Sequence, residues 1–260
     1  MRENTVKTKW RAGECVFGAW LSIPDGHAAE TMAQIGFDYV CVDMQHGVID
    51  YQAAVGMLRA IGTGDSMPFV RVPWNEPGII GKVLDAGAYG VIVPMVNSRA
   101  EAEAAVAACR YAPEGRRSYG PNRVTYYAGA NYYDHANESI ACIPMIETTT
   151  AIESLDDILS VPGVDAIYVG PADLSITLGL PPSVDNSGTF VEALDRIVAG
   201  CKAHGVVPGI HANAQLAATR VASGFRMITI ASDVGGMARA AAEDLRMAGE
   251  SRASQLPSYS

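Results

Sequence analysis

The sequence lacks the features of a membrane or secreted protein. None of its apolar runs approaches the ~18–20 residues needed to cross a bilayer. The opening stretch, MRENTVKTKWRAGE, has no apolar core of the kind that a signal peptide carries. We therefore expect a protein that stays in the cytoplasm and has no membrane as a partner.

Positive charge and paired cysteines are scarce as well. Lys and Arg number 19 against 28 Asp and Glu, which gives a formal net charge of −9. An acidic surface without a basic cluster argues against nucleic acid as a partner. The five cysteines are widely spaced and include no CxxC pair, which is typical of reduced, buried side chains. These absences favour a protein that handles small metabolites.

Eight short apolar runs dominate the chain of 260 residues, which is 49% hydrophobic. Each run is nearly continuous in apolar residues, as expected of a strand that is covered on both faces. The runs occupy residues 16–23, 38–44, 68–73, 90–96, 140–146, 166–171, 206–212 and 227–232.

Helix-length segments separate these runs and carry local start and stop signals. The expected N-caps are Asp25, Asp50, Asn75, Ser98, Thr150 and Thr189. The expected glycine stops are Gly36, Gly87, Gly205 and Gly224. Strands that alternate with helices eight times predict an α/β protein with one (β/α)8 TIM-barrel domain over residues 1–260. That fold commonly needs about 250 residues.

Three segments depart from this rhythm. Residues 113–139, rich in Gly, Tyr and Asn, predict a long functional loop. Residues 250–260 have no apolar period and predict a disordered tail. The last helix, VGGMARAAAEDLRMAG, is rich in Ala and Met on more than one face. It either packs against another subunit or lies buried against its own barrel.

Two carboxylates stand directly after neighbouring strands. Glu147 follows the run CIPMI, and Asp173 follows IYVGPA. Parallel strands joined by a helix point the same way, so these side chains are expected side by side at one rim of the sheet. Two carboxylates in a dry pocket repel each other unless a cation lies between them, which predicts a metal site. The alternative is that each only caps the helix or turn that follows it.

Other polar residues fall at the same rim, where barrel enzymes carry their chemistry. Arg71 interrupts the apolar run FVRVP, so it either pairs with Asp43 or Asp85 or holds a substrate carboxylate. His46 is either a base oriented by Asp43 or an ordinary hydrogen-bonding residue. No lysine falls at a strand end, which leaves a Schiff-base mechanism without a nucleophile. The rim also holds Trp20, Ser22, His211, Ser232 and Asp233.

Five motifs in order give the chain a resemblance to a known family. They are VDMQHG, RVPWNEPGIIGKVLDAGAYG, PMVNSRAEAEAAVAACRYAPEGRRSYG, PMIET and YVGPADLS. From about residue 13 to 247 the chain resembles the HpcH/HpaI aldolases, the metal-dependent (class II) pyruvate aldolases. The MIET variant is similar to that of members that act on hydroxypyruvate or hydroxy-ketoacids. The resemblance implies a TIM barrel and a carbon–carbon lyase.

The resemblance also implies roles for individual residues. Glu147 and Asp173 would bind a divalent cation such as Mg²⁺, Mn²⁺ or Co²⁺. Arg71 would contact the keto oxygen of a 2-oxoacid, and His46 with Asp43 would move protons. The remaining implied site residues are Asp85 from across a subunit interface, Ala172 and Asp173 through their amides, and Trp20 and Ser118 in the pocket. The family forms hexamers, as trimers of dimers with exchanged C-terminal helices, which implies a homo-oligomer here.

The implied reaction joins or cleaves a bond between an enolate of pyruvate or hydroxypyruvate and an aldehyde. One alternative is oxaloacetate decarboxylation or another 2-oxoacid lyase reaction of the same superfamily. A second alternative is a barrel that only binds a 2-oxoacid, although the Asp43–His46 pair argues against it.

Three residues depart from the family pattern, namely Gln45 for an acidic residue, Met145 for a glutamine, and His211 for an apolar residue. His211 ends the seventh strand, so we expect it to face the approaching aldehyde and to favour hydroxylated substrates. The alternative is a histidine that bonds Asn213 or a backbone carbonyl.

Overall fold

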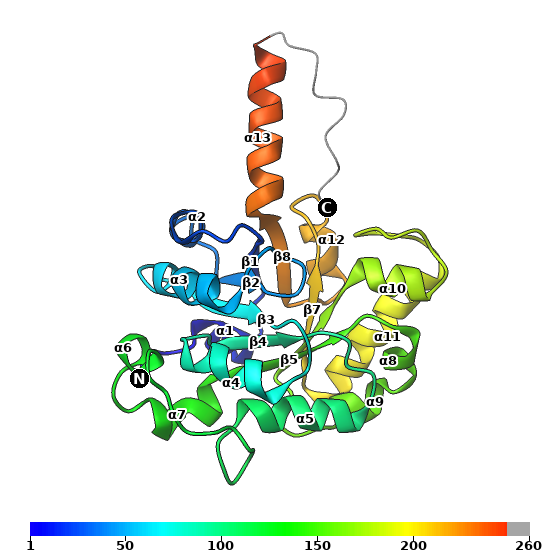
Figure 1. Ribbon diagram of the computed structural model, residues 1–260. Coiled ribbons are helices and arrows are strands. Elements are labelled where there is room, and N and C mark those ends of the chain that lie inside the picture. Colours follow the sequence, from blue (N-terminus) through cyan, green and yellow to red (C-terminus); the bar gives the residue numbers. More distant parts are fainter. Residues whose placement is uncertain (249–260) are drawn as a thin grey trace.

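The computed structural model describes residues 1–248, and its centre is a closed barrel of eight parallel strands (Figure 1). Each strand pairs with the next one along the chain, and β8 pairs with β1. The predicted TIM barrel and all eight predicted strands are confirmed. The strands are β1 Val16–Leu21, β2 Tyr39–Asp43, β3 Met67–Arg71, β4 Gly90–Val93, β5 Ala141–Ile146, β6 Ala166–Val169, β7 Val207–His211 and β8 Met227–Ser232.

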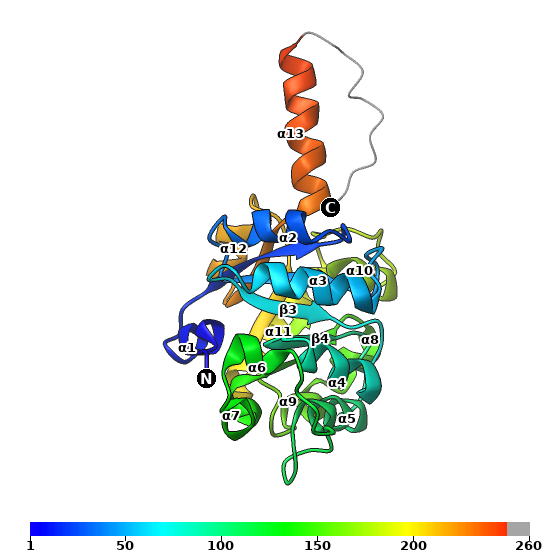
Figure 2. The ribbon, with the colours of Figure 1, turned by 60° about the vertical axis from the view of Figure 1, so that its left-hand side comes forward.

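Helices surround the barrel and follow its strands in sequence (Figures 1 and 2). They are α1 Thr5–Arg11, α2 Gly26–Ala33, α3 Tyr51–Ile61, α4 Pro77–Asp85, α5 Arg99–Cys109, α6 Val124–Ala128, α7 Tyr132–Ser139, α8 Thr149–Glu153, α9 Leu155–Leu159, α10 Pro171–Thr177, α11 Thr189–His204, α12 Ala217–Ala222 and α13 Asp233–Met247. Within residues 1–248, none of these helices combines the length and apolar character needed to cross a bilayer.

Side-chain caps fix where several helices begin. The side chains of Asp25, Asp50 and Ser98 each accept a hydrogen bond from an amide in the first turn, as predicted. The four glycine stops are confirmed by left-handed backbone conformations, which only glycine adopts without strain. Their φ angles are 106° at Gly36, 112° at Gly87, 69° at Gly205 and 104° at Gly224.

Three helices begin at residues other than those predicted. Helix α4 follows Glu76 and begins with Pro77. Proline is tolerated there because an N–H in the first turn of a helix has no intrahelical acceptor. Thr148 caps α8 by accepting the N–H of Ala151. Helix α11 follows Gly188, which makes no side-chain cap. The predicted N-caps that are wrong are Asn75, Thr150 and Thr189.

Large rings fill the barrel interior, and glycines on neighbouring strands make room for them. Tyr39 and Phe69 are fully buried and stack with ring centroids 5.2 Å apart. A Cβ at Gly18 would lie 2.1 Å from the Tyr39 ring, and one at Gly90 would lie 2.7 Å from the Phe69 ring. Burial of such a side chain contributes roughly 1.5–3 kcal/mol. The glycines inside β1 and β4 therefore serve packing.

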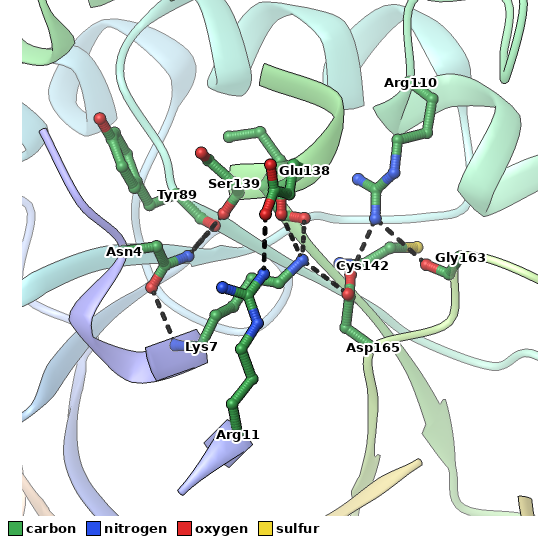
Figure 3. Close-up of polar contacts among 11 residues, drawn as sticks. Asn4, Lys7, Arg11, Tyr89, Arg110, Glu138, Ser139, Cys142, Gly163 and Asp165 are labelled. Atoms are coloured by element: carbon green, nitrogen blue, oxygen red, sulfur yellow. Dashed lines mark hydrogen bonds and ion pairs between the residues drawn. The ribbon is translucent and has the colours of Figure 1, made fainter. Parts of the chain in front are cut away.

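The amino-terminal helix α1 was not predicted, and polar side chains at its start reach residues beside the barrel strands (Figure 3). Asn4 donates to the carbonyl of Tyr89 at 3.2 Å. Lys7 and Arg110 both bond the carboxylate of Asp165, at 2.7 Å and 2.8 Å. Because Tyr89 and Asp165 directly precede β4 and β6, the contacts of Asn4 and Lys7 tie α1 to the amino ends of these strands.

The predicted loop 113–139 contains two short helices, α6 and α7. It connects α5 to β5, so it lies mainly on the amino-terminal side of the barrel, away from the rim. The predicted long connection is therefore present and carries two short helices, while its functional role stays a prediction. The predicted disordered tail, 250–260, lies outside the described residues.

Helix α13 projects away from the barrel in both views (Figures 1 and 2). Asp233 at its start is its only buried residue, while Met237 and Met247 are 61% and 65% exposed. The alternative in which this helix lies buried against its own barrel is therefore wrong.

Candidate active site

A cavity of about 380 Å³ opens at the carboxyl ends of the strands. Seven of the eight strands or their following turns contribute side chains to its wall. It brings together the predicted site residues Trp20, Asp43, His46, Arg71, Glu147, Ala172, Asp173 and His211. None of the described residues on this wall is a lysine, so a Schiff base has no nucleophile here.

Arg71 and Asp43 form a two-point ion pair at the base of the cavity. Nε of Arg71 donates to Oδ1 of Asp43 at 2.9 Å, and Nη2 donates to Oδ2 at 2.7 Å. Burial raises the pKa of Asp43, but the bonds and charge of Arg71 outweigh it and leave that pKa lowered. The guanidinium also lies over the Trp20 ring, 4.9 Å from its centroid. Of the alternatives for Arg71, the structure therefore shows the pair with Asp43.

The imidazole of His46 is not oriented by Asp43. The contact between the two residues runs through the backbone, because the amides of Gln45 and His46 donate to Oδ1 of Asp43 at 3.0 Å and 3.3 Å. With Arg71 added, the Asp43 carboxylate has most of its acceptor sites filled. The expected side-chain pair is therefore replaced by a turn that holds His46 at the cavity, where it is exposed.

Glu147 is 2% exposed and is positioned by the turn after β4. The amide of Met95 donates to its Oε1 at 2.8 Å. Met95 has a φ of 55°, a left-handed conformation that is uncommon outside glycine and that points its N–H at this carboxylate. Thr148, and not Glu147, caps the following helix. The alternative reading of Glu147 as a helix cap is therefore wrong.

Asp173 lies in the first turn of α10, which follows β6, and its charge acts on Glu147. The N-cap of that helix is Gly170, so Asp173 does not cap it, although a carboxylate in a first turn is favoured by the helix dipole. A Cβ at Gly170 would lie 2.3 Å from Oε2 of Glu147, so only glycine lets the two elements approach this closely. Burial, together with the charge of Asp173, raises the pKa of Glu147 to about 7.

This carboxylate pair fits a divalent cation. Within residues 1–248, no group of three or more His, Cys, Asp or Glu side chains clusters as a metal site. Two carboxylates alone leave coordination positions for water and substrate oxygens, which hard divalent cations accept. A cation would also relieve the repulsion that raises the pKa of Glu147.

His211 reaches the cavity from the end of β7. Its Nδ1 lies 3.2 Å from the hydroxyl of Tyr168, and its ring stands edge-on to Trp20 at a centroid distance of 5.3 Å. Burial, and then the charge of Arg71, lowers the pKa of His211 to about 4. The expected alternative partners, Asn213 and a backbone carbonyl, are not its contacts in the described structure.

Asp85 and Ser118 lie apart from this cavity. They line a second cavity of about 660 Å³ between α4, α5 and residues 116–118. Asp85 pairs with the buried Arg117 at 2.7 Å. Within one chain, these two predicted residues therefore do not join the others.

Tyr168 and Val184 also line the cavity, although neither was predicted. Tyr168 sits inside the apolar run of β6, where an aromatic residue usually indicates core packing. Val184 lies in the connection between α10 and α11, which carries no recognisable motif. No local signal distinguishes either residue from an ordinary apolar side chain.

Residues 17–240 match the family model described as HpcH/HpaI aldolase/citrate lyase. The chain belongs to this family. It is 40% identical over 240 residues to hydroxypyruvate/pyruvate aldolase of Rhizorhabdus wittichii, which covers 92% of this chain and 96% of the relative. It is 34% identical over 248 residues to 4-hydroxy-2-oxo-heptane-1,7-dioate aldolase of Escherichia coli, which covers 92% of both. A crystal structure of a family protein from Burkholderia cenocepacia J2315 matches with a TM-score of 0.89 at 33% identity, over 95% of this chain and 99% of that one.

As an HpcH/HpaI family member the protein is a carbon–carbon lyase of the aldolase class, as predicted. The two curated relatives carry different substrate names. Family membership therefore determines the class of reaction. The choice of substrate depends on the residues that line the cavity.

Proposed function

We propose that this protein is a metal-dependent aldolase that joins or cleaves a bond between the enolate of a pyruvate-like 2-oxoacid and an aldehyde. The observation that carries the proposal is the meeting of Glu147, Asp173 and Arg71 in one cavity. The name of the Rhizorhabdus wittichii relative supports pyruvate or hydroxypyruvate as the donor. The proposal thus adds to the reaction class a donor, a pyruvate-like 2-oxoacid, and a mechanism, metal-dependent enolate formation.

Glu147 and Asp173 are the proposed ligands of the cation, with Mg²⁺, Mn²⁺ and Co²⁺ as the candidates that an all-oxygen set suits. When bound, such a cation polarises the keto group of a 2-oxoacid and eases removal of a C3 proton. Asp43 keeps Arg71 charged and in place, because its bonds raise the pKa of the guanidinium despite burial. The N–H groups of Arg71 that Asp43 does not use are available for the developing enolate oxygen.

His46 is the proposed proton carrier. Its ring is exposed at the cavity and makes no hydrogen bond to Asp43, so it is free to exchange protons with a reacting group or an ordered water. The amides of Ala172 and Asp173, in the first turn of α10, are the proposed binding site for the substrate carboxylate. Trp20 closes the cavity beside Arg71.

We also propose a homo-oligomer, in the form of a hexamer built as a trimer of dimers. Helix α13 leaves Met237 and Met247 exposed and projects away from the described part of its own barrel, which supports its exchange with a second copy. The cavity that holds Asp85 and Ser118 supports a contribution of those residues to a neighbouring copy. Asp85 and Ser118 would then lie apart from Glu147 of their own chain because they act at the site of a neighbouring copy.

A donor and acceptor panel tests the proposed function. Pyruvate, hydroxypyruvate and 2-oxobutyrate are each offered with aldehydes of different length and charge, with and without added divalent cation. We expect aldol product only with cation present and with pyruvate or hydroxypyruvate among the preferred donors. Oxaloacetate decarboxylation without any aldol product would overturn the proposal in favour of a decarboxylase.

A further inference from the structure

A chain of hydrogen-bonded hydroxyls runs through the barrel interior and ends at His211. The hydroxyl of Tyr39 on β2 lies 2.9 Å from that of Thr229 on β8, which lies 2.5 Å from that of Tyr168 on β6. Tyr168 lies 3.2 Å from Nδ1 of His211 on β7. We call Tyr39, Thr229 and Tyr168 the hydroxyl chain. Each is at most 1% exposed, so bulk water does not reach these groups.

The direction of the hydrogen bonds follows from a count of donors. Each hydroxyl has one hydrogen, and within residues 1–248 the hydroxyl chain has no partners besides its own members and His211. If Nδ1 carried a hydrogen and donated it to Tyr168, three hydroxyl hydrogens would compete for two remaining contacts. One buried donor would then have no acceptor, which is costly.

The opposite direction satisfies every donor. Tyr39 then donates to Thr229, Thr229 to Tyr168, and Tyr168 to Nδ1 of His211. A neutral histidine that accepts at Nδ1 carries its hydrogen on Nε2. Burial and the charge of Arg71, which lower the pKa of His211 to about 4, agree with a ring that is neutral near pH 7.

The placement of the ring aims Nε2 at the cavity. Nδ1 is turned toward the buried Tyr168, and Nε2 lies on the other side of the imidazole. His211 lines the cavity, and its edge-on contact with Trp20, at an interplanar angle of 89°, restrains rotation of the ring. The wall therefore presents a fixed, uncharged N–H next to the charged Arg71.

We propose that the hydroxyl chain locks His211 as the Nε2–H tautomer, and that this N–H donates to an oxygen on the carbon chain of the aldehyde. The choice of an aldehyde as the ligand rests on the proposed aldolase function. Hydroxylated aldehydes offer an acceptor at this point, and hydrocarbon aldehydes do not. Tyr168 and the two hydroxyls behind it are positioning residues, since they act on the substrate through His211.

Nitrogen NMR of histidine-labelled protein tests the tautomer without any substrate. Solid-state ¹⁵N spectra of the complete oligomer separate protonated from unprotonated ring nitrogens, and the signal lost in His211→Phe assigns this residue among the five histidines. At pH 7 we expect Nε2 protonated and Nδ1 unprotonated. In Tyr168→Phe, which removes the donor to Nδ1 and keeps the ring, we expect a mixture of tautomers. An Nδ1–H tautomer or an imidazolium in the parent protein would overturn the proposal.

Acceptor selectivity tests the role of the N–H. The ratio of kcat/KM for glyceraldehyde to that for propanal is measured with pyruvate as the donor. We expect the ratio to fall about two- to tenfold in His211→Phe, the range of one hydrogen bond, and by less in Tyr168→Phe. His204→Phe is the matched control, because His204 pairs with Asp156 at the far end of α11. We expect it to leave the ratio unchanged.

The two measurements separate this proposal from the proposed function. An unchanged ratio in His211→Phe, together with the Nε2–H tautomer, would remove the residue from aldehyde recognition and overturn the proposal. A parent protein without aldol turnover for any aldehyde would instead overturn the aldolase function. The tautomer assignment would stand in that case, because it needs no turnover.

Discussion

Asp43 and Arg71 face each other across β2 and β3 and are joined by two hydrogen bonds, at 2.9 Å and 2.7 Å. The strand register pairs these two residues directly, so the ion pair is built into the sheet. Asp43 is 2% exposed, and a carboxylate buried to that degree needs its cation to remain charged. The pair therefore holds the guanidinium rigid at the cavity while leaving part of its N–H fork unused.

Arg71→Lys should lower kcat/KM by more than tenfold, on the order of 1.4 kcal/mol or more in transition-state free energy. Lysine keeps the charge and loses the planar fork that meets Asp43 at two points. Arg99→Lys, on the exposed pair with Glu103, is the control and should match the parent. If both Arg71→Lys and Arg71→Ala turn over like the parent, the residue serves only structure.

Glu147→Gln and Asp173→Asn should each abolish metal-dependent turnover, because each removes one of only two anionic ligands. Metal content measured after dialysis should fall in both variants. The control is Asp156→Asn, on the opposite, amino-terminal side of the barrel. Full activity of the parent protein after treatment with a chelator would refute the metal mechanism.

His46→Ala should keep its metal and its affinity for a non-reacting 2-oxoacid, while aldol turnover falls by about 10² to 10⁴. The reason is that His46 moves protons and does not bind the cation. Metal analysis, ligand titration and turnover on the same preparation check the three parts. Loss of metal in this variant would place His46 among the ligands.

The contribution of His211 to the stability of the protein should fall as the pH drops from about 6.5 to 4. Glu147, whose pKa is raised to about 7, acts in the opposite direction both in the parent and in a His211 variant. The pKa of His211 is lowered to about 4 in the folded chain from the ordinary 6.5, so the unfolded chain binds the proton first. The contribution of His211 to the free energy of unfolding then decreases by at most about 1.4 kcal/mol per pH unit in this window. Denaturant unfolding at several pH values should show a smaller slope of stability against pH in His211→Phe than in the parent or in His204→Phe. Equal slopes would contradict the lowered pKa.

Met237→Glu should weaken the oligomer, because it places a charge on the exposed apolar side of α13 that we assign to a subunit contact. Light scattering coupled to gel filtration gives the mass of the particle. We expect smaller species than for the parent, and no change for Lys202→Glu on the exposed surface of α11. A parent protein that is a monomer would rule out the exchanged helix.

Short sequence patterns determine much of the fold. The eight apolar runs specify strands covered on both faces, and caps such as Asp25 and Asp50 mark where helices begin. Carboxylates that follow successive parallel strands must reach the same rim, which is why the sequence alone predicts Glu147 and Asp173 as a pair. These features depend on residues close together in the chain, so the pattern alone determines them.

Tertiary structure decided which side chains touch. Strand register decided whether the Asp43 carboxylate bonds the side chain of His46 or that of Arg71. The guanidinium of Arg71 on β3 lies opposite this carboxylate, while the turn after β2 contributes only backbone amides. The placement of Asp85 outside the cavity likewise depends on the tertiary structure. So does the contact of His211 with Tyr168, which are 43 residues apart in the chain. Such contacts depend on barrel closure and on side-chain rotamers, which no local pattern encodes.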